Sequence, residues 1–79
     1  MIFLVEYDRP RGVLVRLHPF EDNQREAAEQ LRLQRELEVA QRGLRHEVVL
    51  LQAADEDAIR RTHRRYFMTA SQIVASSSS

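Results

Sequence analysis

The chain has 79 residues, 43% of them hydrophobic, and its twelve arginines balance twelve acidic residues, so the formal net charge is zero. This length excludes several domains, the hydrophobic content excludes a chain that is disordered throughout, and the lack of cysteine excludes disulfides and thiolate metal sites. A core of this size is marginal, so we expect good packing or a partner subunit to stabilise it.

The first expected element is a β-hairpin. Residues 2–7 are rich in β-branched and aromatic side chains that alternate between two faces, and residues 13–17 have the same character. Pro10 and Gly12 between the two runs are typical of a turn, in which we expect Gly12 to adopt a positive φ.

A long helix to about Arg42 is expected next. Acidic and amide side chains at 21–23 can cap its start, and Gly43 is a natural C-cap. Its apolar residues form two opposite groups: Leu33, Leu37, Ala40 and Leu44 on one side, and Ala27, Ala28, Leu31 and, less regularly, Val39 on the other. We expect one group to cover a sheet and the other to meet the sheet edge or something else.

The remaining elements are a third strand, a second helix and a tail. Residues 46–53 form the strand, and Val48 to Leu51 are apolar on both faces. Acids at 55–57 suit the start of the helix. Its expected buried side carries Ile59, His63, Tyr66, Phe67, Ala70, Ile73 and Val74. Four serines at 76–79 predict a disordered tail.

In chain order these elements predict one ββαβα domain over residues 1–75, of the α+β class. The hairpin and a split β-α-β unit would form a three-stranded mixed sheet with the first strand in the centre. Both helices would then cover the same face and leave an apolar face bare, which a monomer rarely does. We therefore expect a homodimer. The expected contact residues are Leu14, Ala27, Ala28 and Leu31.

The most concentrated charge lies in the second helix. Its arginines are Arg60, Arg61, Arg64 and Arg65. They could contact phosphates of a nucleic acid or another anion. The alternative is a solvated face, because Glu56 and Asp57 lie four residues before Arg60 and Arg61 and can pair with them.

No motif for catalysis or metal binding emerges from the sequence. His18, His46 and His63 are far apart, whereas a histidine metal site needs converging ligands. Every serine follows residue 70, and we interpret the carboxylates of Glu6 and Asp8 as ordinary surface groups. We therefore predict no catalytic residue, no cofactor and no metal.

The sequence favours a small, non-enzymatic, homodimeric module that binds itself or another protein. The alternative is a nucleic-acid-binding module that uses the arginines of the second helix, with Arg9 and Arg11 of the hairpin. A third hypothesis is a small-ligand pocket at the dimer interface. The first residues predict neither a signal peptide nor a membrane span, so we expect a cytoplasmic bacterial protein without a membrane partner.

Overall fold

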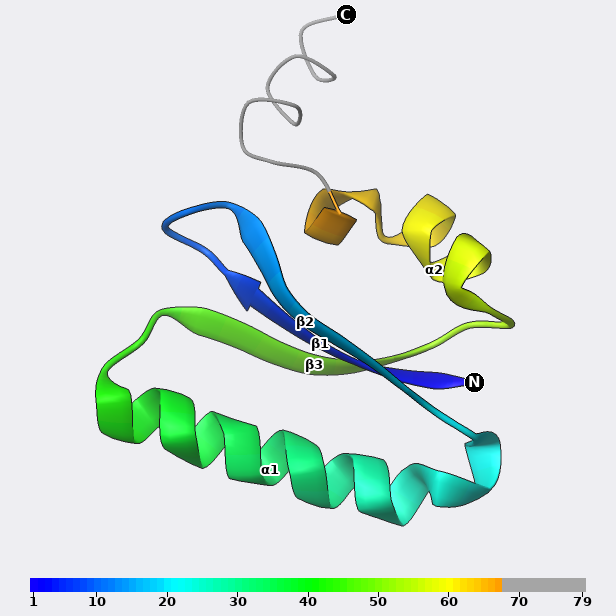
Figure 1. Ribbon diagram of the computed structural model, residues 1–79, viewed down its shortest axis with the longest axis horizontal. Helices are drawn as coiled ribbons and strands as arrows, with labels where there is room; N and C mark the ends of the chain where they lie inside the picture. Colours follow the sequence, from blue (N-terminus) through cyan, green and yellow to red (C-terminus); the bar gives the residue numbers. More distant parts are fainter. Residues whose placement is uncertain (68–79) are drawn as a thin grey trace, which may run out of the picture.

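The computed structural model describes residues 1–67 and shows the α+β architecture, with a sheet between two helical layers (Figure 1). The elements are β1 (Ile2–Asp8), β2 (Val13–Phe20), the 3-10 helix η1 (Asp22–Gln24), α1 (Arg25–Arg42), β3 (His46–Gln52), α2 (Glu56–Thr62) and the 3-10 helix η2 (Arg64–Phe67). The order ββαβα matches the expectation. The buried positions expected at Ala70, Ile73 and Val74 and the serine tail at 76–79 lie outside the described residues.

The sheet has the order β2-β1-β3, which confirms the first strand as the central one. The prediction of a mixed sheet is wrong, because β1 pairs antiparallel with both β2 and β3. The two outer strands run parallel to each other, as the split unit requires, but they are not neighbours and form no parallel ladder.

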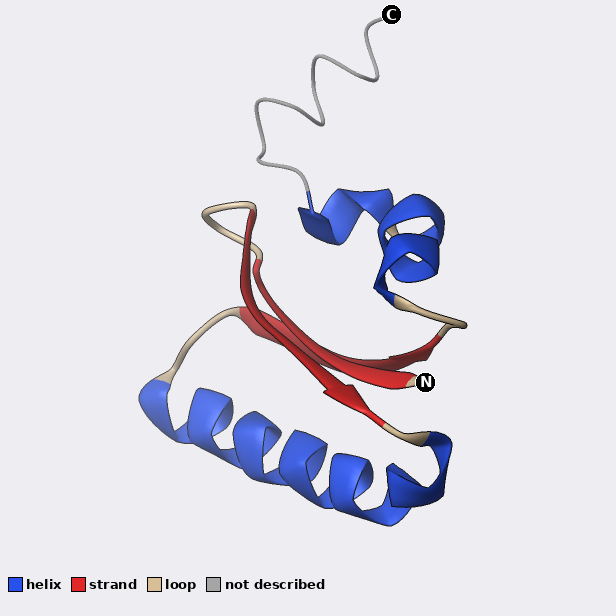
Figure 2. Cartoon of the chain, turned by 45° about the vertical axis from the view of Figure 1, so that its right-hand side comes forward, coloured by secondary structure: helices blue, strands red, loops and turns tan. Residues whose placement is uncertain are grey.

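The helices cover opposite faces of this sheet, so the expectation that they share one face is wrong (Figure 2). The physical reason is β1 itself, whose residues from Ile2 to Tyr7 are all buried. Successive side chains of a strand point to opposite faces, so a central strand that is apolar on both needs a cover on both. The sheet face that was expected to be bare is therefore covered by α1, over β1 and β3.

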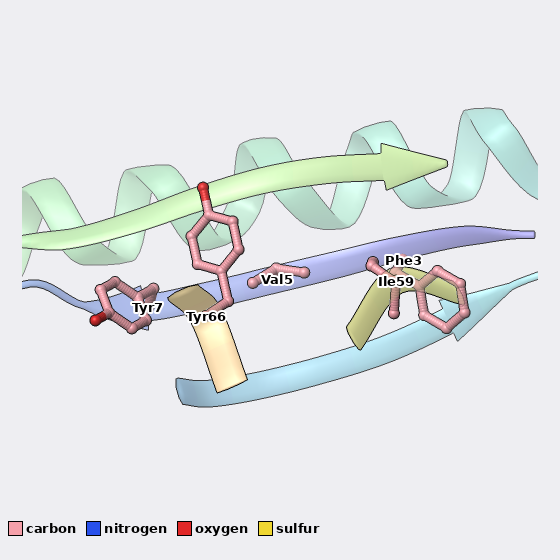
Figure 3. Packing of buried hydrophobic residues seen from close by; sticks show 5 residues of the cluster. All are labelled: Phe3, Val5, Tyr7, Ile59 and Tyr66. Atoms are coloured by element: carbon pink, nitrogen blue, oxygen red, sulfur yellow. The ribbon is translucent and has the colours of Figure 1, made fainter. Parts of the chain in front are cut away.

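The core consists of two clusters, one on each side of β1. On one side, Ile59 of α2 and Tyr66 of η2 pack on the β1 side chains Phe3, Val5 and Tyr7 (Figure 3). The Tyr7 and Tyr66 rings meet edge to face, with centroids 5.3 Å apart. This cluster attaches the short second helix to the sheet.

On the other side of the sheet, Leu4 packs with Val39 of α1 and Val48 of β3. The long helix lies over β1 and β3 rather than over β2. Polar residues therefore remain exposed on the corresponding face of β2, among them Arg16 and His18.

Two glycines set the loops at one end of the sheet. Gly12 has a φ of 66° and its N–H donates to the carbonyl oxygen of Asp8 at 2.8 Å, which confirms the expected turn conformation. Gly43 also has a φ of 66° and is the C-cap of α1. The hairpin turn and the α1–β3 loop lie side by side, since the N–H of Arg9 donates to the carbonyl of Arg45 at 3.3 Å.

Candidate functional site

A cluster of charged side chains links β1, α1 and β3 near the hairpin end of the sheet. We call Glu6, Asp8, Arg35 and His46 the hairpin-end cluster. Glu6 is fully buried on the sheet face that α1 covers. Two nitrogens of the Arg35 guanidinium each donate to one carboxylate oxygen of Glu6 at 2.9 Å, which is bidentate pairing.

His46 is the second partner of the buried Glu6 carboxylate. Nδ1 of His46 lies 2.6 Å from Oε2 of Glu6, and Nε2 of His46 lies 3.6 Å from Oδ2 of Asp8. His46 begins β3 opposite Asp8, so the strand register brings the two together. Arg35 also pairs with Glu38 one helical turn along α1. The carboxylate of Glu6 is thus enclosed by one guanidinium and one imidazole.

The environment of Glu6 keeps it ionised. Burial raises the pKa of Glu6, but hydrogen bonds from His46 and Arg35 and the positive charge of Arg35 lower it, and the resulting pKa lies below its usual 4.5. A general base must contact the group from which it takes a proton. Because Glu6 has no exposed surface, the carboxylate serves to join three elements rather than to meet a substrate.

The lowered pKa of Glu6 makes a prediction about acid stability. Its folded pKa is below its unfolded value, so its contribution to the free energy of unfolding is present above about pH 4.5 and is lost as the pH falls through the folded pKa. Urea unfolding measured between about pH 6 and pH 3 should show a steeper loss for the wild type than for Glu6→Gln, which has no charge to protonate. Parallel pH profiles would contradict this assignment.

Two open hollows adjoin the hairpin-end cluster. The larger, with a volume of about 590 Å³, lies between the hairpin turn and the α1–β3 loop. It is lined by Asp8, Pro10, Arg11, Val13, Val15, Gly43, Leu44, Arg45 and His46. The second, of about 490 Å³, is lined by Arg9, Pro10, Arg45 and His46.

The arginines predicted as an anion or nucleic-acid contact are Arg60, Arg61, Arg64 and Arg65, and the structure does not make them one free cationic face. Arg60 pairs with Glu56 at 2.9 Å, as the sequence spacing indicates, and Arg65 pairs with Glu47 of β3 at 2.9 Å. Arg61 and Arg64 have no acidic partner at ion-pair distance among residues 1–67. Half of this positive charge is thus compensated within the chain.

The expected dimer contacts mostly face inward. Ala28 has no exposed surface, Leu31 packs against the Leu4 cluster, and Leu14 packs against the cluster around Phe3. Ala27 alone of the four is exposed. The sheet-facing side of α1 is therefore the Ala28–Leu31 side.

The opposite side of α1 points away from the sheet and carries leucine, alanine and glutamine side chains without charge. We call Gln30, Leu33, Gln34, Leu37, Ala40 and Gln41 the outer face of α1; all six are exposed. The exposed fractions are 54% for Leu33 and 55% for Leu37, and Leu44 just beyond the helix is 38% exposed. No residue of this face carries a charge, in a chain of which 30% is charged.

The interpretation of Glu6 as an ordinary surface group is wrong, because its side chain is fully buried, and its pairing with Arg35 was not expected from the sequence. The available signal was a charged residue at an inward position of each element: Glu6 within the apolar run of β1, and Arg35 between Leu31 and Val39, four residues from each. Helical residues four apart share a face. Had the sheet-facing side of the helix been identified, the two charges would have been expected to meet.

The histidines form no metal site in the part of the chain that the structure describes. His18 and His46 lie on the two outer strands, opposite β1 residues that are four positions apart, because they pair with Leu4 and Asp8 respectively. Within residues 1–67 no three histidine or acidic side chains are grouped so that they could hold a metal ion.

Comparisons with known protein families, curated proteins and solved structures found no match to this chain. Among the helices of residues 1–67, none combines the length and the apolar character needed to span a membrane.

Proposed function

We propose that this chain is a small protein-interaction module that self-associates, and that the outer face of α1 is its contact surface. The observation that carries the proposal is the exposure of Leu33 and Leu37, each more than half exposed, on a helix face without charge. We assign this module no catalytic step and no cofactor. The buried carboxylate of Glu6 is paired with Arg35 and His46, so it is not available as a general base.

The composition of this face is typical of a surface that another protein covers. The core of a protein interface is depleted in charged residues, whereas a solvated helix face usually carries them. Here Leu33, Leu37 and Ala40 follow one another at intervals of four and three residues, the spacing of a seam between two helices. Leu44 extends the apolar surface at one end.

The chemistry of the face suits a second copy of the same chain. In a two-fold dimer each surface meets itself, so charges near the axis would face like charges, and an uncharged face avoids that repulsion. The amide of Gln34 carries both donors and an acceptor, so it can pair with its own counterpart. Acidic Glu26 and Glu29 precede this stretch and Arg42 follows it, so an antiparallel copy brings opposite charges together.

The test is a single charge at the centre of the outer face. Leu37→Glu places a carboxylate on each copy near the two-fold axis. We expect the like-charge repulsion to lower dimer affinity by at least about a hundredfold, which corresponds to about 2.8 kcal/mol. Light scattering after size exclusion measures the change in mass. Because Leu37 is 55% exposed, the circular dichroism spectrum should not change.

Ala54→Glu is the matched control, since Ala54 is exposed in the loop between β3 and α2 and away from the proposed contact. It should leave the dimer intact. A Leu37→Glu variant that associates as strongly as the wild type would overturn the proposed contact surface.

A second candidate function is nucleic-acid binding through the phosphate backbone. It is supported by Arg61 and Arg64, which have no acidic partner among the described residues. The two functions respond differently to salt: phosphate contacts weaken steeply as salt rises, and apolar self-association does not.

A further inference from the structure

The larger hollow at the hairpin end is lined by both apolar and cationic side chains. We call its apolar residues Val13, Val15 and Leu44 the floor, and its cationic residues Arg11 and Arg45 the rim. Its volume of about 590 Å³ falls within the range of small-molecule sites, which join apolar walls to a few polar groups. None of the residues that line this hollow belongs to the outer face of α1, and Leu44 lies just beyond that helix.

The positive charge around the two hollows is only loosely compensated. Three arginines line them, together with a single aspartate. Nη2 of Arg9 lies 3.6 Å from the carboxylate of Glu47, and Nε of Arg11 lies 3.7 Å from that of Asp8, both beyond good hydrogen-bond length. Arg45 has no acidic partner at ion-pair distance within residues 1–67.

The one acidic group in the larger hollow is already engaged. The carboxylate of Asp8 accepts a hydrogen bond from the backbone N–H of Arg11 at 3.2 Å and lies 3.6 Å from Nε2 of His46. It is also only 13% exposed. The repulsion between Asp8 and an incoming anion is therefore reduced, whereas the side chain of Arg11 is 81% exposed.

The backbone of the two loops is held together before any ligand arrives. The N–H of Arg9 donates to the carbonyl of Arg45, and Gly12 and Gly43 adopt the positive φ that the two turns require. The backbone of these loops therefore loses little conformational entropy when a ligand binds.

We propose that this hollow binds a small organic anion, with its carboxylate or phosphate group between Arg11 and Arg45 and its apolar body on Val13, Val15 and Leu44. Guanidinium groups bind both kinds of oxyanion through paired N–H donors. The apolar floor distinguishes such a ligand from an inorganic anion, which has nothing to place there.

The test is a titration of the protein with phenyl phosphate, benzoate and inorganic phosphate, followed through the backbone amide NMR signals. We expect saturable shifts at Arg11, Gly43, Leu44 and Arg45 with the phenyl compounds and weaker binding of inorganic phosphate. The tighter of the two phenyl compounds identifies the preferred acidic group. No saturable shift at these residues with any of the three probes would overturn the proposal.

Two variants test whether the rim arginine Arg45 contributes to binding of the phenyl compounds. Arg45→Gln removes an exposed charge while keeping the carbonyl that accepts from Arg9, and it should weaken binding of the phenyl compounds by about tenfold or more. Arg61→Gln is the matched control on α2, and it should bind as the wild type does. Equal affinity of Arg45→Gln and the wild type, or an equal loss in both variants, would also overturn the proposal.

Discussion

Replacement of Arg35 by leucine should destabilise the fold by about 3–5 kcal/mol. Arg35 supplies the guanidinium that pairs with Glu6, and the side chain of Glu6 has no exposed surface. Without this guanidinium, His46 is the remaining partner of the buried carboxylate. Removing one member of a buried ion pair costs more stability than the intact pair contributes, because the other charge stays buried without compensation. For a small domain this is a large part of the total free energy of unfolding. Urea unfolding with the midpoint and slope fitted separately measures the loss.

The double variant Glu6→Leu/Arg35→Leu is the control for this result. Replacing both members of a buried ion pair by apolar residues of similar size is often neutral or stabilising. We therefore expect the double variant to recover most of the stability that Arg35→Leu loses. A double variant as unstable as Arg35→Leu would show that the loss comes from packing of the long Arg35 side chain rather than from the unpaired charge.

The second large effect is expected at Ile59, the residue of α2 with no exposed surface. Ile59→Ala should cost about 2–5 kcal/mol, because it removes buried methyl and methylene groups and leaves a cavity above Phe3 and Val5. The short helix has few other anchors, so the same change should also increase hydrogen exchange of the α2 amides.

Leu33→Ala is the matched control for Ile59→Ala. It removes the same number of carbon atoms from a side chain that is 54% exposed. At a protein concentration too low for self-association, we expect a change within about 0.5 kcal/mol in the free energy of unfolding. Equal losses in the two variants would contradict the placement of α2 on the sheet.

The order of the elements and the central place of β1 were predictable, because they follow from local patterns. Alternation in the first two runs, Pro10 and Gly12 between them, and Gly43 after the helix are signals carried by a few neighbouring residues. The split arrangement followed from the apolar character of β1. These features need no knowledge of which surfaces meet.

The distribution of the helices over the two faces was not predictable in the same way. It depends on which side of each element turns inward, and α1 offers two apolar sides that the sequence alone does not rank. The regular series of Leu33, Leu37 and Leu44 is the exposed one, whereas the smaller Ala28 and the charged Arg35 face the sheet. Pairing with Glu6 allows a charged residue at that inward position.

The hairpin-end cluster was missed for the same reason. Glu6 and Arg35 are 29 residues apart in sequence, and only the packing of α1 on β1 brings them into contact. The rim of the hollow likewise depends on the hairpin turn and the α1–β3 loop lying together, a contact that no local pattern indicates. In both cases the chemistry belongs to the assembled fold rather than to a motif.

Sedimentation equilibrium of the wild-type chain tests self-association through the outer face of α1. We expect twice the 9.3 kDa chain mass at micromolar concentration. We also expect a dissociation constant that changes little between low and high salt, because the contact is uncharged at its centre. A mass of 9.3 kDa at every concentration measured would show that the chain is a monomer and would rule out self-association.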